Sequence, residues 1–335
     1  MSPPRENPHL TGHQAAEGAI LTALASGRLP HAWLLLGPRG VGKATLAFRF
    51  ARYLLANPDA ATDEGPGLFG DAAPADPSAA SLYLDPGHPV FRRTVSGGHT
   101  DLLVLDESSA TGRTSQIPVE AVRGLSPFLH QTAGEGGRRI VVIDALDEIN
   151  TAGANALLKL LEEPPAGAVL ILVAHSLARV LPTIRSRCRL LRMPPLSPAD
   201  VQAVLEQQAP DAAPDDLAQA AALSEGSPGR ALALLEDDGL AIFQAMEAFW
   251  RQPDRIQPDA LTALAGLGGQ DAAHFQHFVS AFTAGLVRAA QAAGGGPAWD
   301  TLWHDTVHLC ERTEAVYLDR RQVALNRLTA AAKLG

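Results

Sequence analysis

Residues 37–44, with the sequence GPRGVGKA, constrain the fold of this chain more than any other segment. They follow the apolar run Ala32–Leu36 and lead into Lys43–Ala56, where apolar residues recur at helical spacing. A strand, a glycine-rich turn and a helix in this order form a phosphate-binding loop, because glycines let backbone N–H groups turn toward an anion. The candidate cofactor-binding residues of this loop are Gly37, Gly40, Gly42 and Lys43.

The first half of the chain alternates strand-like and helix-like segments. Its apolar runs are continuous rather than alternating, which is typical of parallel strands covered on both faces. One predicted helix, Thr151–Glu163, ends at a pair of prolines. This alternation predicts an α/β fold with a parallel, doubly wound, five-stranded sheet. The predicted strands are Ala32–Leu36, Leu102–Leu105, Ile140–Ile143, Val169–Ala174 and Arg189–Met193.

From Ser197 onward the strand signal disappears and the sequence is helical. Ser-Pro pairs at 197–198 and 227–228 are typical helix starts, and Gly294–Pro297 predicts an internal loop. We therefore expect a P-loop module over 1–195, a small helical unit over 196–240 and a helical domain over 241–335. That last domain carries Phe275, Phe278 and Phe282, which predict either an oligomerisation surface or an intramolecular core.

Residues 57–99 are rich in Ala, Pro, Asp and Gly and show little periodicity. They predict a surface excursion or a partly disordered insertion. His88 and His99 lie in or next to it, and we interpret them as solvated loop residues rather than as a metal pair, because zinc sites need three or four ligands.

Composition narrows the function classes. The chain has 36 acidic and 27 basic side chains, a formal charge of −9, which disfavours a protein that coats nucleic acid by charge alone. Two cysteines, Cys188 and Cys310, cannot form a disulfide framework or a four-cysteine zinc site. The chain starts without a secretory pattern and lacks an apolar run of roughly 20 residues, so we expect a cytoplasmic protein without membrane contact.

Two positions that handle metal and water in P-loop enzymes are alanine here. Ala44 replaces the Ser or Thr that holds Mg²⁺, and Thr45 lies about 100° further round the helix. The run Arg138–Asp144 resembles the second nucleotide motif, in which the final acid holds the metal through water. The next position, usually a glutamate that orients water, is Ala145. Thr45 and Asp144 join the candidate cofactor-binding residues, and the sequence predicts a loop that binds but hydrolyses poorly.

Three further motifs carry a family resemblance: NALLK at 155–159, LEEPP at 161–165 and SRC at 186–188. Together they resemble bacterial clamp-loader subunits, which are AAA+ proteins. Because positions 44 and 145 are alanine, the chain is similar to the delta-prime family of DNA polymerase III rather than to the motor subunits. The resemblance runs from about residue 32 to 230, and more weakly through 318–321. It implies an AAA+ module, a helical lid and a C-terminal helical collar that packs five subunits into an open ring.

The resemblance also implies residue roles. Arg187 of the SRC motif matches an arginine finger, which acts in trans on a neighbour's ATP and can raise the rate by about 10³–10⁵. His175 and Ser176 match the polar sensor of the γ-phosphate, and Arg230 matches the lid arginine that closes over a nucleotide. Many relatives hold a four-cysteine zinc module where this chain has residues 57–99, which contain no cysteine, so no zinc is expected.

The implied function is a largely non-hydrolysing part of the DNA-directed DNA polymerase holoenzyme. Its implied partners are the motor (gamma/tau) and delta subunits, the sliding clamp and primer–template DNA, and its binding of ATP is expected to be weak or absent. Two alternatives stay open. One is an active AAA+ motor subunit, and the other is a P-loop kinase for a small substrate, which would need a lid rich in phosphate-clamping arginines.

Overall fold

The computed structural model describes residues 3–58, 81–106, 117–135 and 137–334. The chain divides into two compact units, Met1–Gln208 with Glu225–Gly229, and Ala209–Ser224 with Arg230–Gly335. Compactness thus assigns the helix Pro198–Gln208 to the first unit. The boundaries at 195 and 240 refer to the functional parts of the resembled family and stay a prediction.

The first unit contains a five-stranded sheet of order β2-β3-β4-β1-β5, in which every neighbouring pair is parallel. This confirms the predicted α/β fold. Each strand lies within one residue of its predicted bounds at either end. The strands are β1 (Ala32–Leu36), β2 (Leu102–Leu105), β3 (Arg139–Asp144), β4 (Ala168–Ala174) and β5 (Arg189–Arg192).

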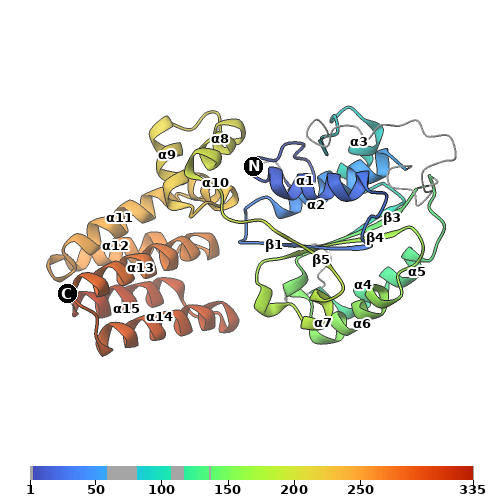
Figure 1. Ribbon diagram of the computed structural model, residues 1–335. Coiled ribbons are helices and arrows are strands. Elements are labelled where there is room, and N and C mark those ends of the chain that lie inside the picture. The colour runs from blue at the N-terminus through green and yellow to red at the C-terminus, as the bar shows by residue number, and fades with distance from the viewer. Residues whose placement is uncertain (1–2, 59–80, 107–116, 136, 335) are drawn as a thin grey trace. The chain divides into compact units, whose positions relative to one another are not determined.

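Two helical layers cover the sheet (Figure 1). In β1, Trp33 and Leu35 face a core formed with α1 and α2, while Leu34 and Leu36 face a core formed with α4 to α7. All these side chains are at most 7% exposed, which explains why the strands read as continuous apolar runs. The helices of this unit are α1 (Gln14–Ala25), α2 (Lys43–Ala56), α3 (Pro89–Val95), α4 (Val119–Arg123), α5 (Leu125–Leu129), α6 (Thr151–Glu162), α7 (Pro182–Arg185) and α8 (Pro198–Gln208).

The glycine-rich loop joins β1 to α2 at the carboxyl edge of the sheet, where parallel α/β folds bind their ligands. β1 lies between β4 and β5, so the segments that follow these two strands lie on either side of its carboxyl end. A side chain at Gly37 would meet the carbonyl oxygen of Met193 at 2.0 Å, and Gly42 has a φ of +106°. Glycine is therefore required at both ends of the loop by geometry as well as by any ligand.

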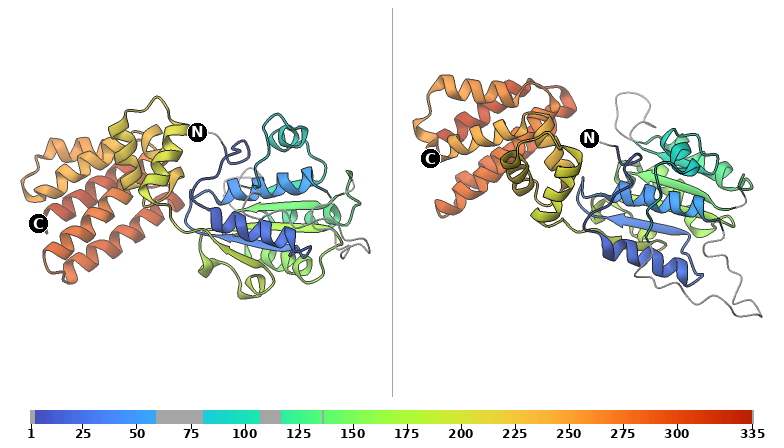
Figure 2. Two further views of the ribbon diagram at one scale, coloured as in Figure 1. Left: turned by 45° about the horizontal axis from the view of Figure 1, so that its top comes forward. Right: turned by 90° about the horizontal axis from the view of Figure 1, so that it is seen from above.

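The described residues of the second unit form helices and the turns that connect them, and α13, α14 and α15 run side by side in it (Figure 2). Phe278 stacks between Phe275 and Phe282, with ring centroids 6.3 and 5.8 Å apart. These three rings are at most 2% exposed, so they form an intramolecular core and not a surface for other subunits. The helices are α9 (Pro214–Leu223), α10 (Pro228–Glu236), α11 (Gly239–Arg251), α12 (Pro258–Gly268), α13 (Ala272–Ala292), α14 (Pro297–Val316) and α15 (Arg320–Ala332).

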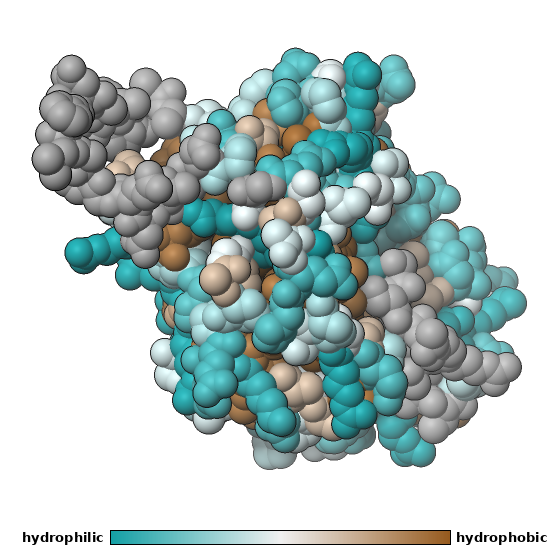
Figure 3. Space-filling view, turned by 90° about the vertical axis from the view of Figure 1, so that its right-hand side faces the viewer, coloured by the Kyte–Doolittle hydropathy of each residue, from teal (hydrophilic) through white to brown (hydrophobic). Residues whose placement is uncertain are grey.

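Part of the predicted insertion 57–99, residues 59–80, lies outside the described residues. Its described end is ordered around α3, where His88 accepts a hydrogen bond from the Val90 N–H at the helix start. On the face of the molecule drawn in Figure 3, hydrophobic side chains are scattered among hydrophilic ones. In the part of the chain that the structure describes, no helix is long and apolar enough to span a bilayer.

Candidate functional site

The glycine-rich loop between β1 and α2 folds around its own lysine. Lys43 is 3% exposed, and its Nζ donates hydrogen bonds to the carbonyl oxygens of Gly37 at 2.7 Å and Pro38 at 2.5 Å. Burial lowers the pKa of Lys43 to about 8, although the nearby carboxylates of Asp144 and Asp147 oppose that shift. The Lys43 amine, a candidate contact for a nucleotide phosphate, is therefore held by the carbonyl groups of its own loop.

Two other segments of the first unit close on the same loop. Ser227 Oγ donates to the carbonyl oxygen of Arg39 at 2.8 Å, and the N–H of Gly229 donates to that of Gly40 at 2.9 Å. Gly229 sits so close that a side chain there would meet Gly40 Cα at 2.9 Å. The ring of His13 lies 2.7 Å from the Val41 carbonyl oxygen, through Nε2. The loop's carbonyl groups are thus satisfied within the chain.

The metal side of the site lacks the groups that magnesium requires. Asp144 ends β3 as predicted, but Ala145 follows it and is 3% exposed, and Ala44 offers no oxygen. Thr45 is 7% exposed, and its place relative to a metal stays a prediction. Among the described residues, no three His, Cys, Asp or Glu side chains lie where they could hold an ion together. The residues present keep the outline of a nucleotide loop, but the side chains at positions 44 and 145 offer no oxygen to a metal.

Asp147 has a structural role that sequence reasoning missed. It lies in a short helical turn, Leu146–Glu148. Its carboxylate accepts the backbone N–H of His175 at 2.9 Å and that of Ser176 at 3.1 Å. The adjacency of β3 and β4 could have indicated this contact, because the ends of parallel strands meet at one edge. Asp147 thereby fixes the segment that holds the predicted sensor residues.

Arg230 begins the main part of the second unit. It donates a hydrogen bond to Ser280 Oγ on α13. Its assignment as the lid arginine over a nucleotide stays a prediction, as does the sensor role of Ser176.

Arg187 lies between α7 and β5. Its Nη1 donates to the Thr183 carbonyl oxygen at 2.9 Å and to Ser186 Oγ at 3.2 Å. Its Nη2 lies 2.9 Å from Oε1 of Glu162 at the end of α6. The neighbouring Cys188 is partly buried against the sheet, and burial raises the pKa of its thiol to about 12. The SRC and LEEPP motifs, far apart in sequence, are therefore in contact through this ion pair.

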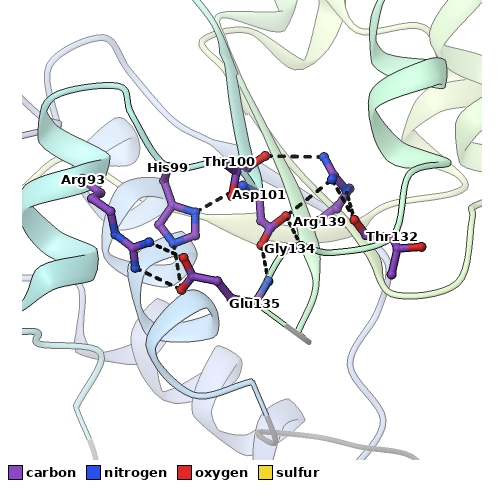
Figure 4. A network of polar contacts seen from close by, with 8 residues as sticks. All are labelled: Arg93, His99, Thr100, Asp101, Thr132, Gly134, Glu135 and Arg139. Atoms are coloured by element: carbon purple, nitrogen blue, oxygen red, sulfur yellow. Dashed lines mark hydrogen bonds and ion pairs between the residues drawn. The ribbon is translucent and has the colours of Figure 1, made fainter.

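A second polar cluster lies at the amino edge of β2 and β3 (Figure 4). Asp101 accepts the N–H groups of Gly134 and Glu135 and lies 3.6 Å from Arg139. His99, interpreted as a solvated loop residue, is instead 4% exposed, and its Nδ1 accepts the Asp101 N–H at 3.2 Å. That interpretation was wrong because the loop packs into the fold, a contact that local composition does not report.

A parallel sheet of order β2-β3-β4-β1-β5, with a glycine-rich loop and lysine after β1, defines a P-loop α/β module of the AAA+ type. The chain is 30% identical over 264 residues to the DNA polymerase III subunit delta' of Escherichia coli, covering 78% of this chain and 71% of that one. It belongs to the family of DNA polymerase III delta' subunits.

Further matches cover other parts of this chain or its whole length. A family model described as DNA polymerase III, delta subunit, matches residues 88–197. The delta' subunit of Pseudomonas aeruginosa is 37% identical over 198 residues, which is 59% of this chain and about half, 53%, of that relative's length. The solved structure of a gamma subunit-related protein from Thermotoga maritima aligns over 94% of this chain and 99% of its own, at 15% identity and a TM-score of 0.46.

Proposed function

We propose that this chain is a stator of the DNA polymerase III clamp loader, which helps to load the sliding clamp onto primed DNA while hydrolysing little or no ATP itself. Relatives named as delta' subunits support its place in that polymerase. In this proposal its partners are the motor (gamma/tau) and delta subunits, the sliding clamp and primer–template DNA, in the cytoplasm. Catalysis by the chain alone is not part of the proposal.

The nucleotide loop is proposed to be catalytically silent. Ala44 and Ala145 stand where a metal ligand and a water-orienting acid would be, and Lys43 is engaged by two carbonyl groups. Removing such pre-placed groups commonly costs several kcal/mol of transition-state stabilisation. We expect weak or absent ATP binding by the isolated chain, and turnover well below about 1 s⁻¹.

One observation carries the proposal: the finger motif is intact in a module whose own site lacks catalytic groups. The Arg187 side chain is 35% exposed, and it contacts residues of α6 and of the α7 turn. A guanidinium presented in this way can stabilise charge on a neighbour's transferring phosphate, a role that lysine cannot copy because it lacks the planar fork. We therefore assign Arg187 the role of an arginine finger in trans.

The helical region 241–335 is proposed to hold the subunit in its ring. Its buried phenylalanines cannot serve as the contact surface, but Val287 on α13 and Trp303 on α14 are 43% and 40% exposed. Contiguous exposed apolar patches mark contacts with other proteins, and we propose that these two side chains belong to such a patch. Replacing both with Ser should weaken assembly while leaving the chain folded, and unchanged co-elution with its partners would refute this part.

Reconstitution tests the whole proposal. The loader is assembled from the motor and delta subunits with wild type, Arg187→Ala or Arg187→Lys, and ATP hydrolysis is measured with clamp and primed DNA. Both variants should assemble, and both should slow hydrolysis in part, because the ring holds other ATP sites. Wild-type hydrolysis by both assembled variants would make Arg187 a structural residue only.

The two alternative functions, a motor subunit and a kinase for a small substrate, require groups that this nucleotide loop does not offer. A motor subunit needs an oxygen ligand for magnesium at position 44, and a kinase needs phosphate-clamping arginines above its own loop. Mg²⁺-dependent turnover by the pure chain at ordinary enzyme rates would support these alternatives instead of the stator.

A further inference from the structure

The side chain of Arg187, the proposed finger, contacts a carboxylate of its own chain. This carboxylate belongs to the first of the two glutamates in the LEEPP motif. Glu162 ends α6, and its Oε1 lies 2.9 Å from Arg187 Nη2. The next residue, Glu163, is equally acidic and exposed, yet among the described residues no hydrogen bond or ion pair reaches its side chain. The two adjacent glutamates thus carry the same side chain, but only Glu162 contacts Arg187 among the described residues.

The contacts of Arg187 leave a defined part of the guanidinium available. The group carries five N–H donors, of which Nη1 uses its pair on Thr183 and Ser186. Nη2 faces Glu162, so Nε–H and one Nη2–H remain without a partner among the described residues. Two such donors in one rigid plane match a pair of phosphate oxygens.

We infer that Glu162 is a positioning residue for Arg187: it fixes the guanidinium plane so that the remaining donors face a neighbour's phosphate. This inference rests on the proposed function of Arg187. Nη1 alone tethers the group at one corner and lets the plane swing, whereas the second contact, from a different helix, fixes its orientation. Glu162 itself does not touch the phosphate, and its effect passes entirely through Arg187.

The expected effect is modest, because both side chains are partly exposed, at 35% and 50%. An exposed ion pair of this kind corresponds to about a two- to fivefold change in rate. It should appear in kcat rather than in KM, because the finger acts on transition-state charge and not on the binding of ATP to the neighbour. Glu162→Gln keeps the shape of the side chain and removes the charge.

A double-mutant cycle in the reconstituted loader tests the inference, with assembly checked by gel filtration. Glu162→Gln should lower kcat about two- to fivefold, and the matched control Glu163→Gln should leave it unchanged. In the Arg187→Ala background, Glu162→Gln should have no further effect. Equal losses in both backgrounds would mean that Glu162 acts independently of the finger, and a higher rate would mean that it restrains the finger. Either result overturns the inference.

The same cycle separates this inference from the proposed function. A slow Arg187→Ala loader with a normal Glu162→Gln loader leaves the finger intact and rejects the positioning role. An Arg187→Ala loader with wild-type hydrolysis rejects the finger itself, and the positioning role with it.

Discussion

The buried Lys43 should make a contribution to the stability of this protein that rises with pH in a defined window. Burial brings its pKa from the usual 10.5 down to about 8 in the folded chain. Below pH 8 the amine is charged in both states, and the folded state bears the whole cost of burying it. Between pH 8 and 10.5 the folded chain releases the proton while the unfolded chain keeps it, so the unfolding free energy rises.

The size of this effect follows from the two pKa values. Their difference corresponds to about 3 kcal/mol in total, of which about 2–3 kcal/mol is regained between pH 7 and pH 10. In urea denaturation over this range, the unfolding free energy of the wild type should rise by this amount relative to that of Lys43→Met, which has no titrating group at that position. Cys188 and Cys310 act in the opposite sense above pH 9, since burial raises their pKa values to about 12 and about 11, but both proteins carry them.

The difference between the two pH profiles therefore isolates Lys43. Parallel profiles would show that the amine is solvated and not held by the loop carbonyls, and the description of a loop closed on its own lysine would then be wrong.

Three further predictions test other contacts of the first unit. Asp147→Ala removes the acceptor of two backbone N–H groups after β4, so urea denaturation should show a loss of about 2–4 kcal/mol, and wild-type stability would contradict the contact. Gly229→Ala should lower the thermal midpoint by crowding Gly40, whereas Gly18→Ala, which meets open space on α1, should not; equal midpoints would exclude the close approach. Burial and Arg93 lower the pKa of His99 below 6.5, so stability should fall as the pH drops below about 6.5, and His99→Gln should reduce that loss; identical acid profiles would refute it.

The strands β1, β3 and β4 were predictable from sequence because each buries both faces, which leaves an uninterrupted apolar run in the sequence. β1 and β2 match their predicted bounds, and β3 extends one residue further at each end, to Arg139 and Asp144. Those two polar residues still pair with β4, at the ends of the sheet where side chains reach solvent or polar partners. The paired length of a strand can therefore extend past the apolar run from which its bounds are predicted.

The contacts that define the candidate site were less accessible to sequence reasoning. The glycine-rich loop and the finger motif are local patterns, so Lys43 and Arg187 could be named in advance. The residues that engage them come from distant parts of the chain: Ser227 lies 188 residues from Arg39, and Glu162 pairs with a different motif. Such contacts depend on how helices and strands pack, which one-dimensional spacing does not encode.

The most direct test of the central claim compares two variants in one reconstituted clamp loader, Lys43→Ala and Arg187→Ala. The first alters the chain's own nucleotide loop, and the second alters the group proposed to serve a neighbour. The account predicts that ATP hydrolysis by the assembled loader is unchanged with Lys43→Ala and slowed with Arg187→Ala. The opposite pattern, a loader slowed by Lys43→Ala and unaffected by Arg187→Ala, would show that this chain hydrolyses ATP in its own site and would contradict the account.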